Sequence, residues 1–349
     1  MARYPELHRA FGLLSNQSDL YKPTSFWEEA SKRIAAEIQD HGVEEFRRLP
    51  LPLSYFVPTY GPPTLGINQE QAQWLSAKFR DYQPSATKTQ LALDAYLSGY
   101  LNALADYRVL AAANPGPDDF GLNEFSESTV GNPIEQFVFE GNTYSRSSLN
   151  YLLGLSLLKR YADLSQIKTV LEIGGGFGTL GEILGKAPRK GIKYIDVDIP
   201  PTQFAAEYYL RANFGADRVA SFEDFDKRER IEVSSLPDFS VMCSWQLPKI
   251  VGEIDLFVNL ISFQEMEPQV VTNYVDLVLK LSPKWILLRN MREGKQRSSG
   301  NGPGVEEPVL SEDYLRMFSS YTLCTKNVFP FGYRTVDGFN SELMLLKRP

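Results

Sequence analysis

The glycine-rich stretch LEIGGGFGTLGE, residues 171–182, is the part of the sequence that most clearly carries chemistry. Glu172 lies in the apolar run TVLEI, which has the pattern of a β-strand and leads directly into a glycine-rich loop. The glycines of this loop are Gly174, Gly175, Gly176 and Gly178. Glycine lets a ligand approach the backbone closely, because it has no side chain. Residues 176–181 also match the dinucleotide fingerprint G-x-G-x-x-G, although this pattern arises easily by chance.

The charge of Glu172 favours one cofactor over another. A carboxylate beside a pyrophosphate is repulsive, whereas a carboxylate beside the sulfonium and ammonium groups of S-adenosylmethionine is attractive. Asp198 lies in the next predicted strand, IKYIDVDI, twenty residues after Gly178, where it can accept hydrogen bonds from two ribose hydroxyls. Because either cofactor contains ribose, Asp198 does not discriminate between them. The sequence therefore predicts S-adenosylmethionine, with a nicotinamide dinucleotide as the alternative.

Two further carboxylates follow a later strand-like run, in the stretch NLISFQEMEP. Methyl transfer to a hydroxyl requires positioning of the acceptor and removal of a proton. The two histidines, His8 and His41, lie in a predicted helical region, so Glu265 is the candidate base or acceptor-orienting group. Glu267 precedes Pro268, where an acid also suits the first turn of a helix. Both glutamates are catalytic candidates.

Positive and aromatic side chains accompany the last predicted strands. Arg289, Arg292 and Lys295 come at the end of the run KWILLRNM and after it, before a Gly/Ser-rich stretch with the composition of a movable lid. Tyr333 and Arg334 lie between the final two strand-like runs, where aromatic rings beside arginine suit a carbohydrate or a nucleotide-linked sugar. The predicted substrate-binding residues are Arg289, Arg292, Tyr333 and Arg334. 

The order of helical and strand-like segments predicts the architecture. Residues 1–131 read as a mainly helical N-terminal region, with helical spacing over 25–49, 69–82 and 87–113 and a proline-rich connection at 49–66. Residues 132–349 then alternate apolar runs with helical ones, which indicates an α/β domain with a doubly wound, mostly parallel, Rossmann-like sheet. The last two runs have no helix between them, so we expect an antiparallel hairpin at one edge.

Composition limits the partners. Lys and Arg total 36 against 43 Asp and Glu, and this acidic balance argues against nucleic acid or an anionic membrane surface. The N-terminus has no apolar signal core and no run approaches the length of a membrane span, so we expect a cytoplasmic protein. A metal-assisted mechanism would need converging acids, but the run KWILLRNM offers only Asn290, and no metal is predicted.

These motifs resemble those of the class I S-adenosylmethionine-dependent methyltransferases. VLEIGGGFG is similar to their first motif, and YIDVDIPP is similar to their second-strand motif with its ribose-binding acid. The resemblance covers about residues 132–349. It implies that Glu172 lies near the methionine end of the cofactor. It also implies that the end of the third strand, CSWQLP, lies near the adenine, through Ser244, Trp245 and Gln246.

A narrower resemblance concerns the acceptor. GNTYSRSSLNYL, NLISFQEMEP and NVFPFGYRTVDGFNSELML together are similar to a bacterial group described as sugar O-methyltransferases. That similarity implies that Tyr144 and Ser145 approach the cofactor, and that the acceptor is a hydroxyl of a sugar or glycosylated small molecule. The alternatives are N-methylation of an amino sugar or small metabolite, and a non-catalytic cofactor-binding scaffold. For the N-terminal region, a cap over the substrate and a homodimer interface both remain open.

Overall fold

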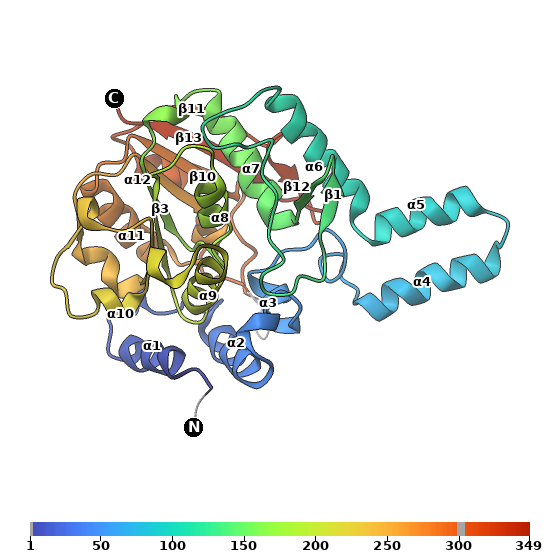
Figure 1. The fold of residues 1–349 in the computed structure, drawn as a ribbon, viewed down its shortest axis with the longest axis horizontal. Helices are drawn as coiled ribbons and strands as arrows, with labels where there is room; N and C mark the ends of the chain where they lie inside the picture. Colours follow the sequence, from blue (N-terminus) through green and yellow to red (C-terminus); the bar gives the residue numbers. More distant parts are fainter. Residues whose placement is uncertain (1–2, 299–303) are drawn as a thin grey trace.

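The computed structural model describes residues 3–298 and 304–349, and its centre is a nine-stranded sheet (Figure 1). The order across the sheet is β11 (Thr322–Asn327), β13 (Asn340–Lys347), β10 (Trp285–Met291), β9 (Leu256–Leu260), β3 (Thr169–Ile173), β4 (Lys193–Asp198), β7 (Phe239–Cys243) and β5 (Val219–Ala220), with β12 (Tyr333–Arg334) paired to β13. Two small pairs lie outside it: β1 (Phe137–Phe139) with β2 (Asn142–Tyr144), and β6 (Ile231–Glu232) with β8 (Ile250–Val251).

The pairing directions confirm the predicted fold class. Strands β5, β7, β4, β3, β9 and β10 are parallel to their neighbours in that order, whereas β13 runs antiparallel to both β10 and β11. The chain leaves β3 toward β4 and β7, and then returns to β9 on the other side of β3. Strand order thus reverses between β3 and β9, which is where ligands of open α/β sheets bind, beyond the carboxyl ends of the strands.

Helices cover both faces of the sheet, as a doubly wound architecture requires. Neighbouring residues of β3 show the two faces, because Val170 belongs to one hydrophobic cluster and Leu171 to the other. Helices on the Val170 side are α7 (Arg146–Lys159), α8 (Thr179–Lys186) and α9 (Thr202–Phe214). Those contributing to the Leu171 side are α10 (Phe222–Phe225), α11 (Pro268–Lys280) and α12 (Ser311–Met317).

The N-terminal region is helical, as predicted, and part of it shares the core of the sheet domain. Its helices are α1 (Pro5–Ser15), α2 (Glu28–His41), α3 (Pro50–Tyr55), α4 (Gln69–Tyr82), α5 (Thr87–Leu97) and α6 (Tyr100–Ala113). Ile34, Phe46 and Phe56 belong to the same hydrophobic cluster as α8 residues such as Leu180. By contrast, α4 and α5 form an arm that projects from the body (Figure 1).

Two sequence-based expectations about these helices were wrong. The proline-rich connection at 49–66 contains α3, because Pro50 and Pro52 both lie in its first turn, where a missing N–H costs no hydrogen bond. The helix expected over 87–113 is broken at Gly99, which has a φ of 80°. A Cβ at Gly99 would collide with the backbone of Gly61, so the root of the arm requires glycine there.

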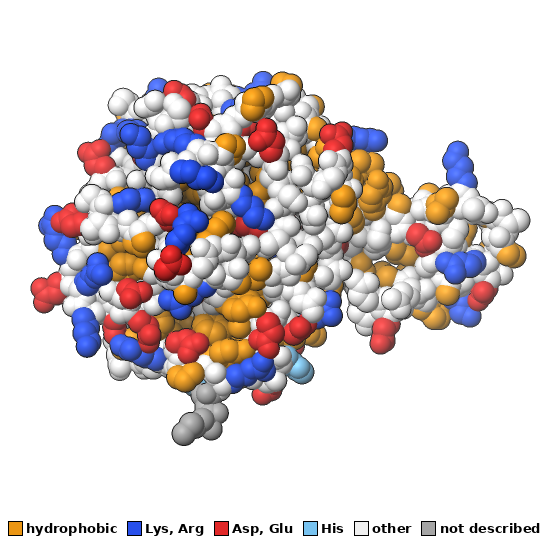
Figure 2. Space-filling view, in the orientation of Figure 1, with side chains coloured by type: hydrophobic (Ala, Val, Ile, Leu, Met, Phe, Trp, Pro, Cys, Tyr) orange, Lys and Arg blue, Asp and Glu red, His pale blue; other side chains and the backbone are white. Residues whose placement is uncertain are grey.

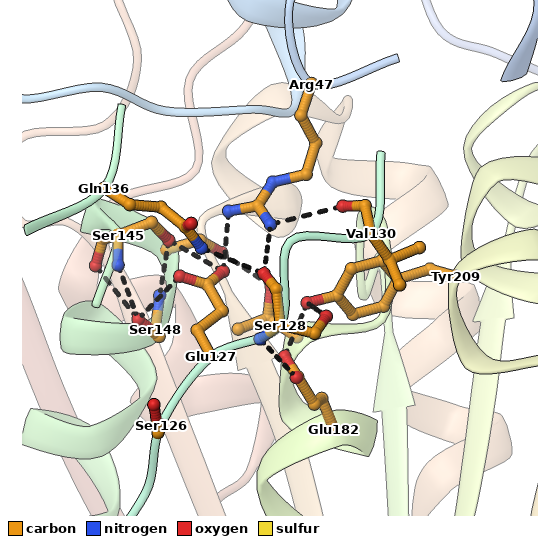
Figure 3. Close-up of polar contacts among 12 residues, drawn as sticks. Arg47, Ser126, Glu127, Ser128, Val130, Gln136, Ser145, Ser148, Glu182 and Tyr209 are labelled. Carbon is orange, nitrogen blue, oxygen red and sulfur yellow. Dashed lines mark hydrogen bonds and ion pairs between the residues drawn. The ribbon is translucent and has the colours of Figure 1, made fainter. Parts of the chain in front are cut away.

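A buried polar network fastens the N-terminal region to the sheet domain (Figure 3). Arg47 donates to Glu127 Oε1 at 2.8 Å, and both side chains are almost fully inaccessible to solvent. Ser145 and Ser148, at the start of α7, donate to the two oxygens of the same carboxylate. The backbone N–H of Ser128 continues the network to Glu182 on α8, at 2.7 Å. The segment around Arg47 is therefore held by charge as well as by apolar contact.

Candidate active site

A cavity opens at the predicted position, at the carboxyl ends of the central strands. It is lined by the glycine loop after β3, by Asp198 at the end of β4, by Ser262 after β9 and by Arg289 on β10. Segments of the N-terminal region cover it, including Thr24, Trp27 and the stretch around Phe56. The cavity is thus lined by both the sheet domain and the N-terminal region.

The glycine loop requires its glycines for two different reasons. Gly174, Gly176 and Gly178 have φ values of 73°, 63° and 87°, which residues with a side chain rarely adopt. Gly175 lies directly over buried carboxyl groups, since a Cβ there would come 2.5 Å from Asp196 Oδ1 and 2.9 Å from Glu172 Oε2. The loop therefore brings bare backbone to the cavity while covering an acidic cluster.

That acidic cluster consists of Glu172, Asp196 and Asp198. Glu172 is fully buried and accepts hydrogen bonds from Tyr151 at 2.7 Å and from Tyr194 at 2.6 Å. Burial raises the pKa of Glu172 to about 7, although the two tyrosine hydroxyls lower it by stabilising the charged form. Burial, Asp198 and Glu172 together hold the pKa of Asp196 well above its usual value. Burial makes negative charge costly at this position, and a cationic ligand would reduce that cost.

Asp198 lies where the ribose-binding acid was predicted. Its Oδ2 accepts from the backbone N–H of Gly176 at 3.1 Å, and its Oδ1 accepts from the N–H of Ile199 at 2.7 Å. Burial raises the pKa of Asp198 to about 7, while the amides of Ile199 and Gly176 and the hydroxyl of Thr202 lower it. Each carboxylate oxygen keeps a further acceptor position, and Asp198 lines the cavity.

Glu172 is less directly placed than its motif suggests. It does not line the cavity, but Tyr151, which donates to it, does. Its charge can therefore act on a bound cofactor through the loop and through Tyr151. Direct contact between Glu172 and the methionine end stays a prediction.

Glu265 lines the cavity, but its carboxylate already has two partners. Lys295 Nζ donates to Oε1 at 2.6 Å, and Trp27 Nε1 donates to Oε2 at 3.0 Å. Thr24 also donates its hydroxyl to the backbone oxygen of Glu265 at 2.9 Å. Glu265 thus links the N-terminal region to the sheet domain. Each of its carboxylate oxygens keeps a second lone pair, which can accept a hydrogen bond from a substrate.

Glu267 lies at a different kind of site. It is the N-cap residue of α11, and its carboxylate accepts from Ser25 and from the backbone N–H groups of Glu306 and Glu307. It does not line the cavity. Its position agrees with the interpretation that Glu267 begins a helix. Its contacts join three segments of the chain and give no support to a catalytic role.

Only one of the three residues expected near the adenine reaches the cavity. Ser244 lines it and donates to the backbone oxygen of Tyr21 at 2.6 Å. Trp245 instead packs with Ala10 of α1. The Gln246 amide accepts from the backbone N–H of Cys243 and donates to the backbone oxygen of Phe222, so both of its ends have structural partners.

Tyr144 and Ser145 also lie away from the cavity. Tyr144 is fully buried among Tyr107 and Phe139, and its hydroxyl has no partner within the described part of the chain. Ser145 caps α7 and donates to Glu127. The side chains of α7 that do line the cavity are further along the helix, at Ser147, Asn150 and Tyr151.

The four predicted substrate residues divide in the same way. Arg289 lines the cavity, and Tyr333 lies beside it, with the guanidinium carbon of Arg289 5.9 Å from the tyrosine ring centre. Arg292 forms an ion pair with Glu342 and does not line the cavity. Arg334, on β12, is exposed and donates to the backbone oxygen of Gly338. The expected lid falls largely on residues 299–303, which lie outside the described residues.

Sequence reasoning missed Tyr151, Trp27 and Arg146. Tyr151 lies in a helix that is apolar almost all round, and nothing local distinguishes it from a core residue. Trp27 reaches Glu265 across more than two hundred residues of sequence.

Within residues 3–298 and 304–349, no group of three or more His, Cys, Asp or Glu side chains is placed to hold a metal ion. No helix in those ranges has both the length and the apolar character to cross a membrane.

Comparisons with known proteins add little beyond the fold. No family model and no curated protein matches the chain. Among solved structures, a small RNA methyltransferase is similar at 16% identity and a TM-score of 0.39, over 62% of this chain and 27% of that one. A magnesium protoporphyrin IX methyltransferase from Synechocystis with bound S-adenosylhomocysteine gives 11% identity and a TM-score of 0.38, over 78% and 99%.

A third structure, an S-adenosylmethionine-dependent methyltransferase from Clostridium acetobutylicum, gives 12% identity and a TM-score of 0.36, over 56% of this chain and 90% of that one.

Proposed function

We propose that the protein is an S-adenosylmethionine-dependent methyltransferase of the class I type. The observation that carries this proposal is the acidic cluster beneath a glycine loop at the reversal of strand order. Glu172 and Asp196 are fully buried there and Asp198 is partly buried, and neither Glu172 nor Asp198 has an ion-pair partner within the described residues. A cofactor with a sulfonium and an ammonium group would supply the missing positive charge.

The same geometry argues against a nicotinamide dinucleotide. In a dinucleotide site the loop amides are free to donate to the pyrophosphate. Here the N–H of Gly176 donates to the carboxylate of Asp198. An anionic pyrophosphate would have to displace that bond and lie against three carboxyl groups, which is electrostatically unfavourable.

We propose a sugar or glycosylated hydroxyl as the acceptor, and a shallow groove beside the cavity supports this. The groove is lined by the rings of Phe26, Tyr55 and Phe339 together with Lys295 and Asp337. Tyr55 lines both the groove and the cavity, so the two lie next to each other. Flat apolar rings beside hydrogen-bonding charges suit the alternating apolar and hydroxyl faces of a saccharide.

In this scheme Glu265 orients the acceptor hydroxyl and accepts its proton. The methyl group passes in line from the sulfonium to the oxygen, and the chain supplies position and a proton acceptor. The ammonium of Lys295, 2.6 Å from Glu265, fixes the carboxylate at the junction of cavity and groove. No step in this scheme uses a metal.

Titration calorimetry tests the cofactor assignment. We expect S-adenosylmethionine and S-adenosylhomocysteine to bind, and NADH not to bind. Asp198→Ala removes an acceptor of hydrogen bonds from ribose, which costs about 1.5–3 kcal/mol, or roughly tenfold to a hundredfold in affinity. Asp276→Ala, on the exposed side of α11, is the matched control and should bind as the parent does. Preferential binding of NADH would refute the assignment.

N-methylation of an amino sugar or small metabolite is the second candidate, because the two carboxylate oxygens of Glu265 already have partners. An amine can attack unprotonated and needs no base. Glu265→Gln separates the two candidates once an acceptor is known. Oxygen methylation should lose most of its turnover, whereas nitrogen methylation should lose little. A scaffold without activity would bind the cofactor and methylate nothing in extracts of its source organism.

A further inference from the structure

A buried arginine without an acidic partner forms one wall of the cavity. Arg289, on β10, is fully buried and lines the cavity. Its Nη1 donates to Asn150 Oδ1 at 2.8 Å, and its Nη2 donates to the backbone oxygen of Phe331 at 2.7 Å. Its Nε has no hydrogen-bond partner within the described residues. Both partners are neutral, so the charge of this guanidinium is not compensated by direct contact.

A second guanidinium lies close by. Arg146, at the start of α7, donates to the backbone oxygen of Thr59 at 2.8 Å and to the hydroxyl of Thr64 at 3.3 Å. The guanidinium carbons of Arg146 and Arg289 lie 5.3 and 5.9 Å from the ring centre of Tyr333, so one ring contacts both cations. Neither arginine forms an ion pair with any described residue.

Two carboxyl groups lie near the arginines, those of Asp106 and Glu135. Burial raises the pKa of Glu135 to about 7, while the charge of Arg146 lowers it. Asp106, on α6, accepts a hydrogen bond from the Tyr60 hydroxyl at 2.5 Å. Burial raises the pKa of Asp106, while the Tyr60 hydroxyl and the charges of Arg289 and Arg146 lower it. Burial also raises the pKa of Tyr333, but the charges of Arg146 and Arg289, together with hydrogen bonds to Ser341 and Arg146, bring this pKa below its usual value. Among the described residues, the two cations thus face only the partly buried carboxyl groups of Asp106 and Glu135, and Glu135 already accepts from the backbone N–H groups of Tyr60 and Gly61.

We propose that Arg146, Arg289 and Tyr333 form a subsite for an anionic group of the methyl acceptor. Guanidinium groups present planar N–H donors that match carboxylate and phosphate oxygens, and a bound anion removes the cost of burying unpaired positive charge. The acceptor is then an acidic compound, such as a carboxylate- or phosphate-bearing sugar. That the bound anion belongs to the methyl acceptor rests on the proposed function. The anion site itself does not depend on methyl transfer.

Two molecules could place a carboxylate at this subsite: the acceptor, or the cofactor through its α-carboxylate. The geometry favours the acceptor, because Arg289 lies on β10. The glycine loop and Asp198, which would hold the cofactor, lie at the ends of β3 and β4 on the other side of β9. The experiment separates the two sources by measuring anion binding with the cofactor product already in place.

The test is a titration of inorganic phosphate into protein saturated with S-adenosylhomocysteine, at ionic strength held constant with sodium chloride. We expect millimolar binding in the parent, weakened tenfold or more by Arg289→Met and by Arg146→Met. Arg292→Met is the matched control, because Arg292 lies just beyond the same strand, pairs with Glu342 and does not line the cavity. Circular dichroism checks that each variant folds, and the half-buried Arg146 provides the test if Arg289→Met does not fold.

Three results would overturn the proposal: no phosphate binding by the parent, equal binding by the parent and both variants, or loss of S-adenosylhomocysteine affinity in Arg289→Met and Arg146→Met. The last result would assign the arginines to the cofactor carboxylate. If S-adenosylhomocysteine does not bind the parent, the proposed function fails, and phosphate titration of the empty protein still decides the anion site. Any product labelled from methyl-labelled cofactor should be retained on an anion exchanger, and a neutral product would also contradict the proposal.

Discussion

At the scale of single residues, the cavity couples titratable groups to cofactor binding. Burial raises the pKa of Asp198 to about 7, so near neutral pH the empty protein carries a proton there for part of the time. Ribose hydroxyls donate to the charged carboxylate and favour it. Below pH 7, binding of the cofactor therefore requires Asp198 to lose this proton. Each further unit of decrease in pH lowers the affinity by up to tenfold.

We accordingly expect the affinity for S-adenosylhomocysteine to decrease as the pH is lowered from 8 to 6. Calorimetry across this range in buffers of different ionisation enthalpy would also show proton release at the acid end. Asp198→Asn should bind more weakly at pH 8 and show a shallower pH dependence. A parent affinity that does not change with pH would mean that Asp198 does not receive the ribose as its charged form.

Glu172 offers a second residue-scale prediction, because S-adenosylmethionine carries one more positive charge than S-adenosylhomocysteine. Glu172→Gln keeps the shape of the side chain, so the contacts with Tyr151 and Tyr194 can be largely retained. Loss of this buried negative charge should cost the charged cofactor about 1–2 kcal/mol, which is the interaction energy of unit charges about 10 Å apart at an effective dielectric constant of about 20. We expect S-adenosylmethionine to lose several-fold more affinity than its product at pH 8. Equal losses for both ligands would show that the charge of Glu172 does not act on the sulfonium.

At the scale of elements, the Arg47–Glu127 network decides how the N-terminal cover is held. Arg47→Met leaves the carboxylate of Glu127 buried without its cation, and breaking a buried pair in this way costs roughly 3–5 kcal/mol. We expect a correspondingly lower midpoint in urea unfolding. The exposed pair of Arg48 with Glu45 provides the control, since Arg48→Gln should change stability by less than about 1 kcal/mol.

The double variant Arg47→Met with Glu127→Gln tests the reason for that loss. Removing both charges should recover part of the stability, because no unpaired charge then remains buried. A double variant that is as unstable as the sum of both single variants would instead assign the loss to packing.

The elements also show what the sequence could and could not reveal. The sheet and the positions of Gly174 and Asp198 were predictable, because strands and the loops that follow them are local patterns. The arginine cluster was only partly predictable, since Arg146 on α7 and Tyr333 on β12 lie far apart in sequence. Trp245 and Gln246 were misplaced for the same reason. A strand-end position alone does not show whether a side chain turns toward the cavity or toward α1 and Phe222.

At the scale of the whole molecule, the α4–α5 arm differs from the rest of the chain. Its helices bury little, chiefly Ala72 and Leu97, while Trp74, Tyr82 and Leu91 are 59%, 80% and 65% exposed. Apolar side chains are visible along the arm in the space-filling view (Figure 2). The arm therefore adds little to the core, and its exposed apolar surface is the clearest place for a homodimer contact, one of the two alternatives that the sequence leaves open for the N-terminal region.

Replacing residues 69–96 with a short glycine–serine linker tests both statements together. The root of the arm is close-packed, since a Cβ at Gly99 would collide with the backbone of Gly61, so the chain can be rejoined near it. We expect the shortened protein to bind S-adenosylhomocysteine within about twofold of the parent, because the arm contributes no residue to the cavity. Analytical ultracentrifugation should show the parent as a dimer and the shortened form as a monomer. A parent that sediments as a monomer at high concentration would exclude the dimer. Lost cofactor binding in a folded, shortened protein would show instead that the arm supports the cavity at a distance.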